Sequence, residues 1–241
     1  FFNPATKNNM ESVFEIQYKE GTEGFASNFF YTFLVQPITA AEISAVTGIA
    51  EVARTIEGYN IPTPDIIAAY GPGDLRKEAS IGHIMAGGVN YPYTRNYIPP
   101  NPLTNNTNDN WPVYRYSEVL LFIAEALNEQ NKTAEALNYL NSVHAHPRTG
   151  LQALTISSQN ELRVAILNER RIELAFENKR WLDLVRTDRA REVMNAFGAR
   201  VKADPQAYYF PRGIGPSASS YSDIRLLFPI PASEAALNPY F

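Results

Sequence analysis

Residues 116–127 read Tyr-Ser-Glu-Val-Leu-Leu-Phe-Ile-Ala-Glu-Ala-Leu, and this stretch decides the fold. Its apolar side chains recur every three or four residues, which predicts an amphipathic helix. A tight turn over residues 130–132 leads to a second amphipathic segment, residues 133–143. Ala124 and Ala136 are small enough to let the two helices approach closely, so we predict an αα-hairpin.

The size of this hairpin and its alanines are typical of a tetratricopeptide-like repeat, and a lone repeat cannot bury its own apolar face. We expect Thr133 to cap the second helix. Further helices are predicted from the capping box Ser158-Gln-Asn-Glu161, around residues 181–185, and from Asp188 to a C-cap at Gly198. The predicted fold is mainly α: a tetratricopeptide-like α-α superhelix with a large loop-rich, partly extended subdomain packed on it.

Composition divides the chain into a loop-rich part over residues 1–112, a helical block over 113–197 and C-terminal loops over 198–241. Within the first part, residues 12–18 alternate apolar and polar side chains, which predicts an extended segment. The aromatic stretch 25–36 fits either a buried strand or an aromatic loop.

The remaining composition limits the class of protein. With 241 residues and 45% hydrophobic content, the chain is expected to be globular. The absence of cysteine excludes disulfides and cysteine–metal sites, and a net charge of −4 does not suit a nucleic-acid partner. The Asn- and Pro-rich stretch 99–110 reads as a solvated surface connector. The chain begins Phe1-Phe2-Asn3-Pro4, with neither Met nor a signal peptide, so we expect a fragment.

Glu169 and Glu173 lie one helical turn apart in the most charged stretch of the chain. Paired carboxylates can serve a glycosidase, but they can equally hold ion pairs, and we favour ion pairs. Basic residues that could serve as their partners are Arg115, Arg170, Arg180 and Arg186. Asp183 and Arg186 are expected to form a local pair of the same kind.

His144 and His146 could bind a metal ion, yet a histidine at a helix C-terminus before Pro147 also suits the helix dipole. We therefore expect neither a metal site nor a cofactor.

Tyrosines among Asn, Gly and Pro are the more promising binding residues. Tyr59, Tyr91, Tyr93 and Tyr97 could stack on the C–H face of a sugar while amide side chains bind its hydroxyls. The alternative is that these rings pin long loops onto the helices.

Taken in order, several segments resemble the C-terminal half of the SusD/RagB family, the outer-membrane nutrient-binding lipoproteins of Bacteroidetes. The most specific one is Glu-Arg-Arg-Ile-Glu-Leu-Ala-Phe-Glu over residues 169–177, followed by Arg-Trp-Leu-Asp-Leu over 180–184. The other segments are 11–18, 64–70, 74–76, 111–121, 124–127, 227–231 and 237–239. Together they cover nearly the whole chain.

The resemblance implies non-catalytic binding of a glycan, less often a peptide, at the cell surface. It implies a TonB-dependent (SusC-like) transporter as partner, and a lipid anchor and N-terminal repeat helices that would precede Phe1. It also implies that Tyr97, Trp111, Glu169 and Arg170 belong to the scaffold. The ligand-binding candidates are then Tyr31, Tyr59, Tyr91 and Tyr93. A helical-repeat protein-interaction scaffold is the alternative function, and a glycosidase is the third.

One departure from the family pattern falls after the second repeat helix. The family usually carries Val-Arg-x-Arg-Ala-Gly-Leu there, whereas residues 143–151 read Val-His-Ala-His-Pro-Arg-Thr-Gly-Leu.

Overall fold

The computed structural model describes residues 2–34, 39–48, 58–86, 88–97, 106–210, 212–215, 224–237 and 240. The chain divides into two compact units, Phe1–Arg180 and Trp181–Phe241, which are described separately. Helices predominate, with a few short strands, so the predicted mainly α fold is confirmed.

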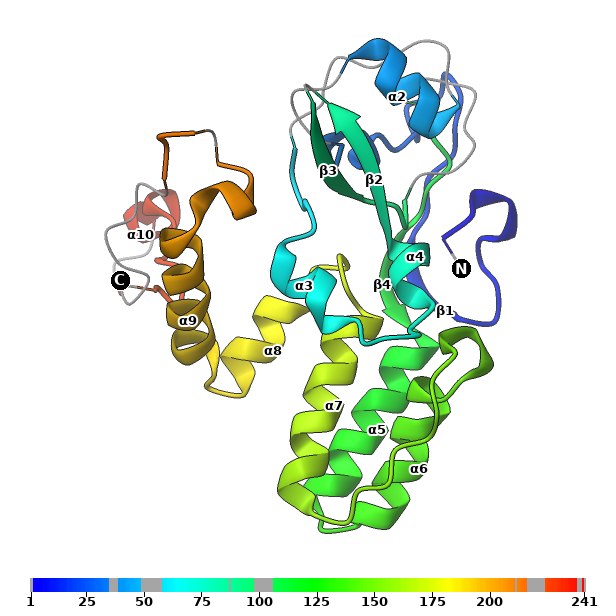
Figure 1. Ribbon diagram of the computed structural model, residues 1–241, viewed down its shortest axis with the longest axis vertical. Coiled ribbons are helices and arrows are strands. Elements are labelled where there is room, and N and C mark those ends of the chain that lie inside the picture. The colour runs from blue at the N-terminus through cyan, green and yellow to red at the C-terminus, as the bar shows by residue number, and fades with distance from the viewer. Residues whose placement is uncertain are drawn as a thin grey trace. The chain divides into compact units, whose positions relative to one another are not determined.

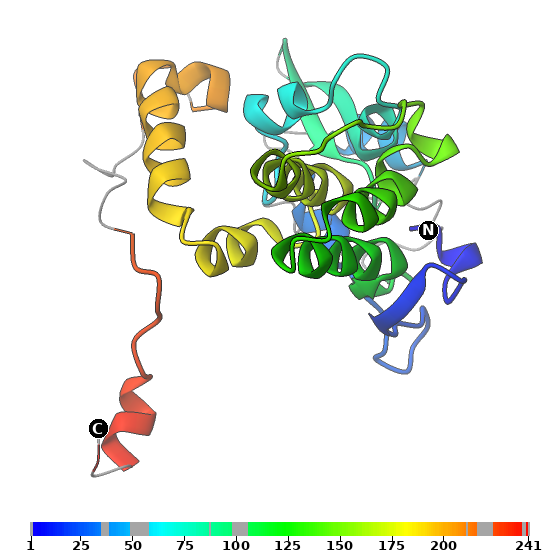
Figure 2. The same ribbon diagram turned by 90° about the horizontal axis from the view of Figure 1, so that it is seen from below.

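Three helices form the main layer of the first unit: α5 (Tyr116–Glu129), α6 (Thr133–His144) and α7 (Gln159–Glu173) (Figure 1). Figure 2 views these helices roughly along their axes. Their shared core consists of Leu121, Ala124, Ala136, Leu140, Val143, Leu162 and Ile166. Ala124 and Ala136 are fully buried, as the predicted close approach of the hairpin requires.

Buried amides hold the crossing from α6 back to α7. Asn128 donates from Nδ2 to the Gln159 carbonyl at 2.9 Å, and Asn141 bonds both backbone groups of Leu154 at 2.8 and 3.0 Å. The hydroxyl of Ser158 accepts from the Glu161 amide, as predicted for the start of α7. The predicted capping role of Thr133 is wrong: Lys132 occupies the N-cap, and the Thr133 hydroxyl bonds Asn128 Oδ1 instead.

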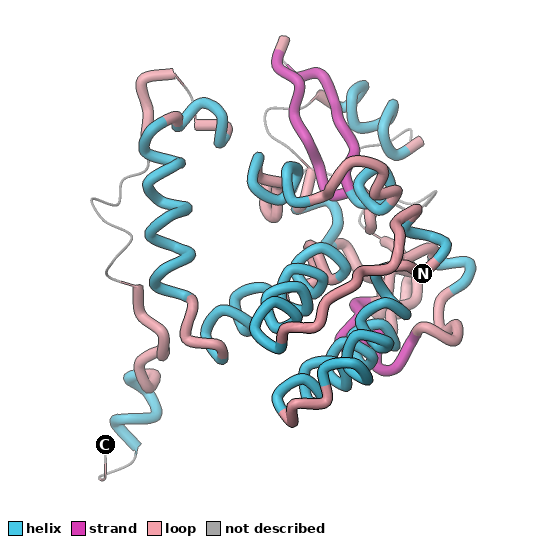
Figure 3. Tube along the Cα trace, turned by 60° about the horizontal axis from the view of Figure 1, so that its bottom comes forward, coloured by secondary structure: helices cyan, strands magenta, loops and turns pink. Residues whose placement is uncertain are grey.

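The strands of the described residues form two antiparallel pairs (Figure 3). Strand β1 (Ser12–Ile16) pairs with β4 (Trp111–Arg115), and β2 (Ile81–Ala86) pairs with β3 (Val89–Thr94). The predicted extended segment 12–18 thus supplies β1. Because its partner β4 runs directly into α5, this pairing ties the N-terminal segment to the helical layer.

The expectation of a solvated connector over 99–110 is wrong for the part that the structure describes, residues 106–110. Asn106, Asn108 and Asn110 accept hydrogen bonds through their side-chain oxygens from the amides of Gly21, Glu20 and Tyr18, at 2.7, 2.8 and 2.9 Å. In an extended segment alternate side chains point to opposite sides, and Thr107 and Asp109, which alternate with the asparagines, are buried.

Short helices complete the first unit: α1 (Phe29–Thr32), α2 (Ala40–Thr47), α3 (Pro64–Ala69) and α4 (Arg76–Ser80), with 3-10 turns η1 (Pro4–Thr6) and η2 (Pro147–Thr149). In the aromatic stretch 25–36, the sequence did not predict α1, which takes up Phe29–Thr32. The rest of its described residues, 25–28 and 33–34, lie outside helices and strands, and 35–36 fall outside the described residues. An aromatic core cluster formed by Leu34, Ile84, Tyr93 and Tyr97 also contacts Phe29, Phe33 and Trp111. The rings of Tyr97 and Trp111 stack at 5.5 Å.

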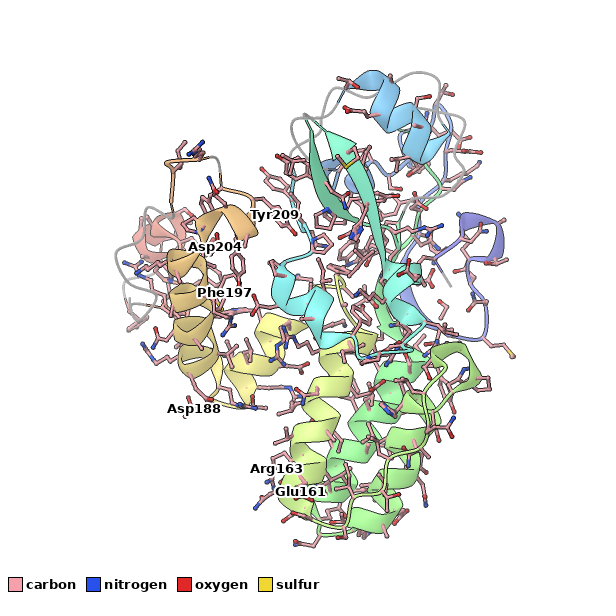
Figure 4. All side chains as sticks on the ribbon, viewed as in Figure 1. Glu161, Arg163, Asp188, Phe197, Asp204 and Tyr209 are labelled. Carbon is pink, nitrogen blue, oxygen red and sulfur yellow. The ribbon has the colours of Figure 1, made fainter. Side chains whose placement is uncertain are left out.

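The second unit contains α8 (Arg180–Arg186), α9 (Ala190–Ala203), the 3-10 turn η3 (Pro205–Tyr208) and α10 (Ala232–Leu237). The predicted helix end at Gly198 is wrong, because α9 continues to Ala203 with Gly198 and Val201 buried along it. Its start is also not at Asp188, since Arg189 holds the N-cap. Figure 4 labels Phe197 on α9 and Asp204 and Tyr209 at the two ends of η3. In the described residues no helix is long and apolar enough to cross a membrane.

Candidate functional site

A buried cluster of charged side chains surrounds the C-terminal half of α7. The Arg76 guanidinium bonds both Asp74 carboxylate oxygens at 2.9 and 2.8 Å and reaches Glu173 on α7 at 2.9 Å. A second Arg76 bond goes to Glu169. Burial alone would lower the pKa of Arg76, but the bonds and charges of Asp74, Glu169 and Glu173 outweigh it and hold the pKa above its ordinary value. Arg76 therefore stays charged and fixes α4 to α7.

Arg115 makes the second junction of this cluster, at the point where β4 becomes α5. It forms a two-pronged contact with Glu177 at 2.9 and 2.8 Å and bonds Glu173 at 3.1 Å and Glu11 at 2.9 Å. Such forked guanidinium–carboxylate contacts fix direction as well as charge. The N-terminal segment, the β1–β4 pair and α7 are thereby joined at one side chain.

Glu173 is the most connected acid of the cluster. Burial tends to raise its pKa, but the charges of Arg115, Arg148 and Arg76 outweigh burial and hold the pKa below its ordinary value. The side chains of Glu169 and Glu173 are each only 3% exposed. Carboxylates enclosed by arginines in this way favour the ion-pair role over the glycosidase alternative, which needs both groups beside a substrate.

Residues that depart from the family pattern contact the same two acids. His144 Nδ1 lies 2.8 Å from Glu169 Oε2, and Arg148 Nη2 lies 2.6 Å from Glu173 Oε1. His146 instead accepts from the Arg148 amide at 3.3 Å, so the two histidines have separate partners. No group of three or more metal-ligating side chains occurs in the described part of the chain.

The remaining residues of the predicted charged set lie elsewhere. Arg170 pairs with Glu118 at 3.1 Å, and its guanidinium lies over the Phe122 ring at 4.7 Å. In the second unit, Asp183 accepts from Arg186 at 2.7 Å, the local pair that the sequence suggested. Arg180, the last residue of the first unit, begins α8. The sequence did not predict Arg76, Glu118, Arg148 or Glu177 as partners.

The four candidate tyrosines have different surroundings. Tyr59 is 59% exposed, Tyr91 is half-buried against the aromatic core cluster, and Tyr93 is buried within it. The register of the β2–β3 pair sets Tyr93 opposite Gly82, where its ring lies against the glycine. Tyr31 lies on α1, and its side chain falls outside the described residues. Of the three described rings, that of Tyr59 is the most exposed.

A surface feature that the sequence reasoning missed is an exposed aromatic patch, defined here as Phe14, Tyr114 and Phe122. The β1–β4 register pairs Phe14 with Tyr114, and the Tyr114 ring contacts Phe122 of α5 at 6.4 Å. Lys179 lies over the Tyr114 ring at 4.5 Å. The alternation of apolar and polar residues in β1 predicted a strand. It did not indicate which face of that strand stays exposed.

Comparisons with known proteins match this chain to one protein family. The model of the SusD family matches residues 74–240. SusD-like protein P2 of Formosa agariphila is 36% identical over an alignment covering 62% of this chain and 29% of the relative. SusD-like protein P25 of the same species is 25% identical, covering 99% of this chain and 49% of the relative. The chain therefore spans half or less of the length of these curated relatives.

Solved structures share the fold. A SusD-like carbohydrate binding protein from Bacteroides fragilis superposes with a TM-score of 0.70 and 23% identity, covering 99% of this chain and 56% of that one. Surface glycan-binding protein A from Bacteroides thetaiotaomicron, in complex with laminarihexaose, gives a TM-score of 0.57 and 24% identity. That match covers 79% of this chain and 46% of the other.

Proposed function

This chain belongs to the SusD family, and on that premise we propose that it binds an oligosaccharide at the cell surface without altering it chemically. The bound glycan is passed to a TonB-dependent transporter of the outer membrane, which is the partner that the resemblance implies. The enclosed ion pairs of Glu169 and Glu173 support a binding role rather than hydrolysis.

The observation that carries the proposal is the shared fold with a surface glycan-binding protein whose structure contains laminarihexaose. In this chain the exposed ring of Tyr59 offers an apolar face, and the next residue, Asn60, is an exposed amide whose Nδ2 donates to the Phe176 carbonyl at 3.2 Å. Sugars bind where an apolar face has hydrogen-bonding groups near it. Tyr59 leads the candidates, and Tyr91 adds a partly exposed edge. Tyr93 is buried in the aromatic core cluster, so its contribution is to hold the β2–β3 hairpin in place.

Isothermal titration calorimetry with laminarihexaose and a panel of other oligosaccharides tests the proposal. We expect saturable binding of at least one glycan, weakened about tenfold by Tyr59→Ala, which corresponds to about 1.4 kcal/mol. Tyr116→Ala is the matched control, because Tyr116 is 51% exposed but lies at the start of α5. Binding that is absent across the panel, or equal in Tyr59→Ala and wild type, contradicts the proposal.

Protein docking is the second candidate function, and the exposed aromatic patch favours it. Contiguous exposed aromatic side chains commonly mark surfaces that contact another protein. If this function holds, the double variant Phe14→Ser with Tyr114→Ser no longer binds the transporter barrel in a pull-down. Calorimetric titrations of the wild-type chain with glycans then show no binding. A glycan-binding chain instead gives saturable glycan titrations, and these two substitutions leave the titrations unchanged.

A further inference from the structure

Asp109 is a buried acid that neither the charged cluster nor the proposed binding surface uses. Its side chain is 3% exposed, and neither carboxylate oxygen has a well-formed hydrogen bond among the described residues. It lies on the inward side of segment 106–110, whose asparagines bond the chain at residues 18–21 on the other side. The asparagine contacts therefore fix Asp109 in place and prevent it from turning outward.

The hydroxyls nearest to Asp109 are committed to other acceptors. Ser27 Oγ lies 2.8 Å from the Asp109 main-chain carbonyl and 2.8 Å from Thr107 Oγ1, while Thr107 Oγ1 donates to the Ser27 carbonyl at 3.0 Å. A charged carboxylate here would lack the donors that normally replace water. Burial accordingly raises the pKa of Asp109 to about 7, against the opposing effects of Thr107 and the Lys7 charge.

Lys7 is the positively charged side chain whose charge opposes the rise in the pKa of Asp109. Its ammonium donates to the carbonyls of Tyr18 at 2.7 Å and Asn108 at 3.4 Å, so it bridges the two segments that the asparagines also join. Ser27 and Thr107 contribute hydroxyls and backbone groups beside Asp109. Two further acids lie on the segments that the asparagines bond: Glu15 accepts from Asn110 at 2.8 Å, and Glu20 has a buried Oε2 with no hydrogen-bond partner among the described residues. Lys7 is thus the counter-ion available when the carboxyl loses its proton to solvent.

We propose that Asp109 and Lys7 form a proton-controlled joint. Asp109 is neutral when protonated, and Lys7 then bonds only main-chain carbonyls. When Asp109 ionises, the Lys7 ammonium only partly offsets the cost of burying the charge, and the contact of residues 2–9 with segment 106–110 weakens. The joint makes the order of the N-terminal segment depend on pH near neutrality.

Denaturant unfolding of the full chain between pH 4 and 8 tests the joint, with Asp109→Asn as a neutral mimic of the protonated acid. The wild-type unfolding constant, relative to that of Asp109→Asn, is expected to rise about tenfold per pH unit up to about pH 7 and then level off. Lys7→Met extends the rise to higher pH, because it removes the opposing charge. Between pH 6 and 8, amide exchange of residues 2–9, corrected for intrinsic rates, becomes faster in wild type but not in Asp109→Asn.

Lys19→Met and Glu23→Gln are the matched controls, because they form an exposed ion pair on a neighbouring segment and should follow the wild-type pH curve. Parallel curves for wild type and Asp109→Asn overturn the proposal, as does an unchanged midpoint in Lys7→Met. Should a variant fail to fold, carboxyl-carbon NMR of the wild-type chain decides: a midpoint near pH 7 supports the joint, and one below pH 5 refutes it.

Discussion

Gly82 shows how a single missing side chain positions an aromatic ring. An ideal Cβ at this residue would lie 2.2 Å from Cζ of Tyr93, far inside van der Waals contact. The β2–β3 register pairs these two residues directly, so the ring occupies the space that a side chain would otherwise fill. Tyr93 consequently packs into the aromatic core cluster with Leu34, Ile84 and Tyr97.

Gly82→Ala should therefore displace the Tyr93 ring and destabilise the chain by about 1–3 kcal/mol, the usual cost of overpacking. Urea unfolding monitored by circular dichroism measures the change. Gly71→Ala is the matched control, since a Cβ at Gly71 meets nothing within 4 Å. Equal stability of the two variants would show that the ring moves aside without cost.

Residue roles of this kind could be predicted only in part. The interpretation of the tyrosines as loop-pinning rings was available from composition, and it fits Tyr97, which is fully buried. The contact between Gly82 and Tyr93 depends on strand register, and no periodicity within either strand reveals it. The burial of Asp109 could not be predicted from a local pattern either, because it follows from contacts of the neighbouring asparagines with residues 18–21.

At the scale of elements, the charged cluster connects the helical layer to the segments that precede it in the chain. Glu169 and Glu173 present one face of α7 to Arg76 after α3, Arg115 at the start of α5 and Arg148 after α6. All three arginines contact Glu173, and the i, i+4 spacing sets Glu169 on the same face, where it contacts Arg76 and His144. Each partner comes from a different element, so the cluster fixes their relative positions.

Arg115→Met should cost about 3–5 kcal/mol, because it leaves Glu173 and Glu177 buried beside a neutral side chain. Urea unfolding at pH 7 measures the loss. The matched control is Arg163→Met, which breaks the exposed Arg163–Glu129 pair near the start of α7, labelled in Figure 4, at a cost of less than about 1 kcal/mol. Similar costs for both variants would mean that burial adds nothing to the Arg115 contacts.

Helices α5, α6 and α7 were predictable from periodicity because a 3.6-residue pattern is contained within each segment. Their boundaries were less so. Thr133 lost its expected cap role to a side-chain bond with Asn128, and α9 passed through Gly198 because that residue packs along the helix. Both outcomes depend on contacts between residues that a local pattern does not report.

At the scale of the whole molecule, family membership was predictable because its motif residues build the scaffold. The segments 74–76, 111–121 and 167–177 supply most of the buried charged cluster. The proposed ligand-binding residues differ, because exposed loop residues such as Tyr59 are not constrained by packing. The sequence therefore indicated the family and the fold more firmly than it indicated the binding surface.

Residues 224–231 of the second unit form neither helix nor strand and expose the apolar side chains of Leu227, Phe228 and Ile230. Phe228 is 94% exposed and is preceded by the exposed Leu227, whereas Leu121 and Leu140 in the helical layer are fully buried. Proteases cut exposed, irregular backbone first.

Chymotrypsin should therefore cleave within residues 224–231 well before it cleaves within 116–173, as intact-mass analysis of a time course would record. The double variant Leu227→Ala with Phe228→Ala should slow this cut about tenfold while leaving the unfolding midpoint unchanged. A first cut within α5, α6 or α7 would instead mean that the helical layer opens more readily than its buried core implies.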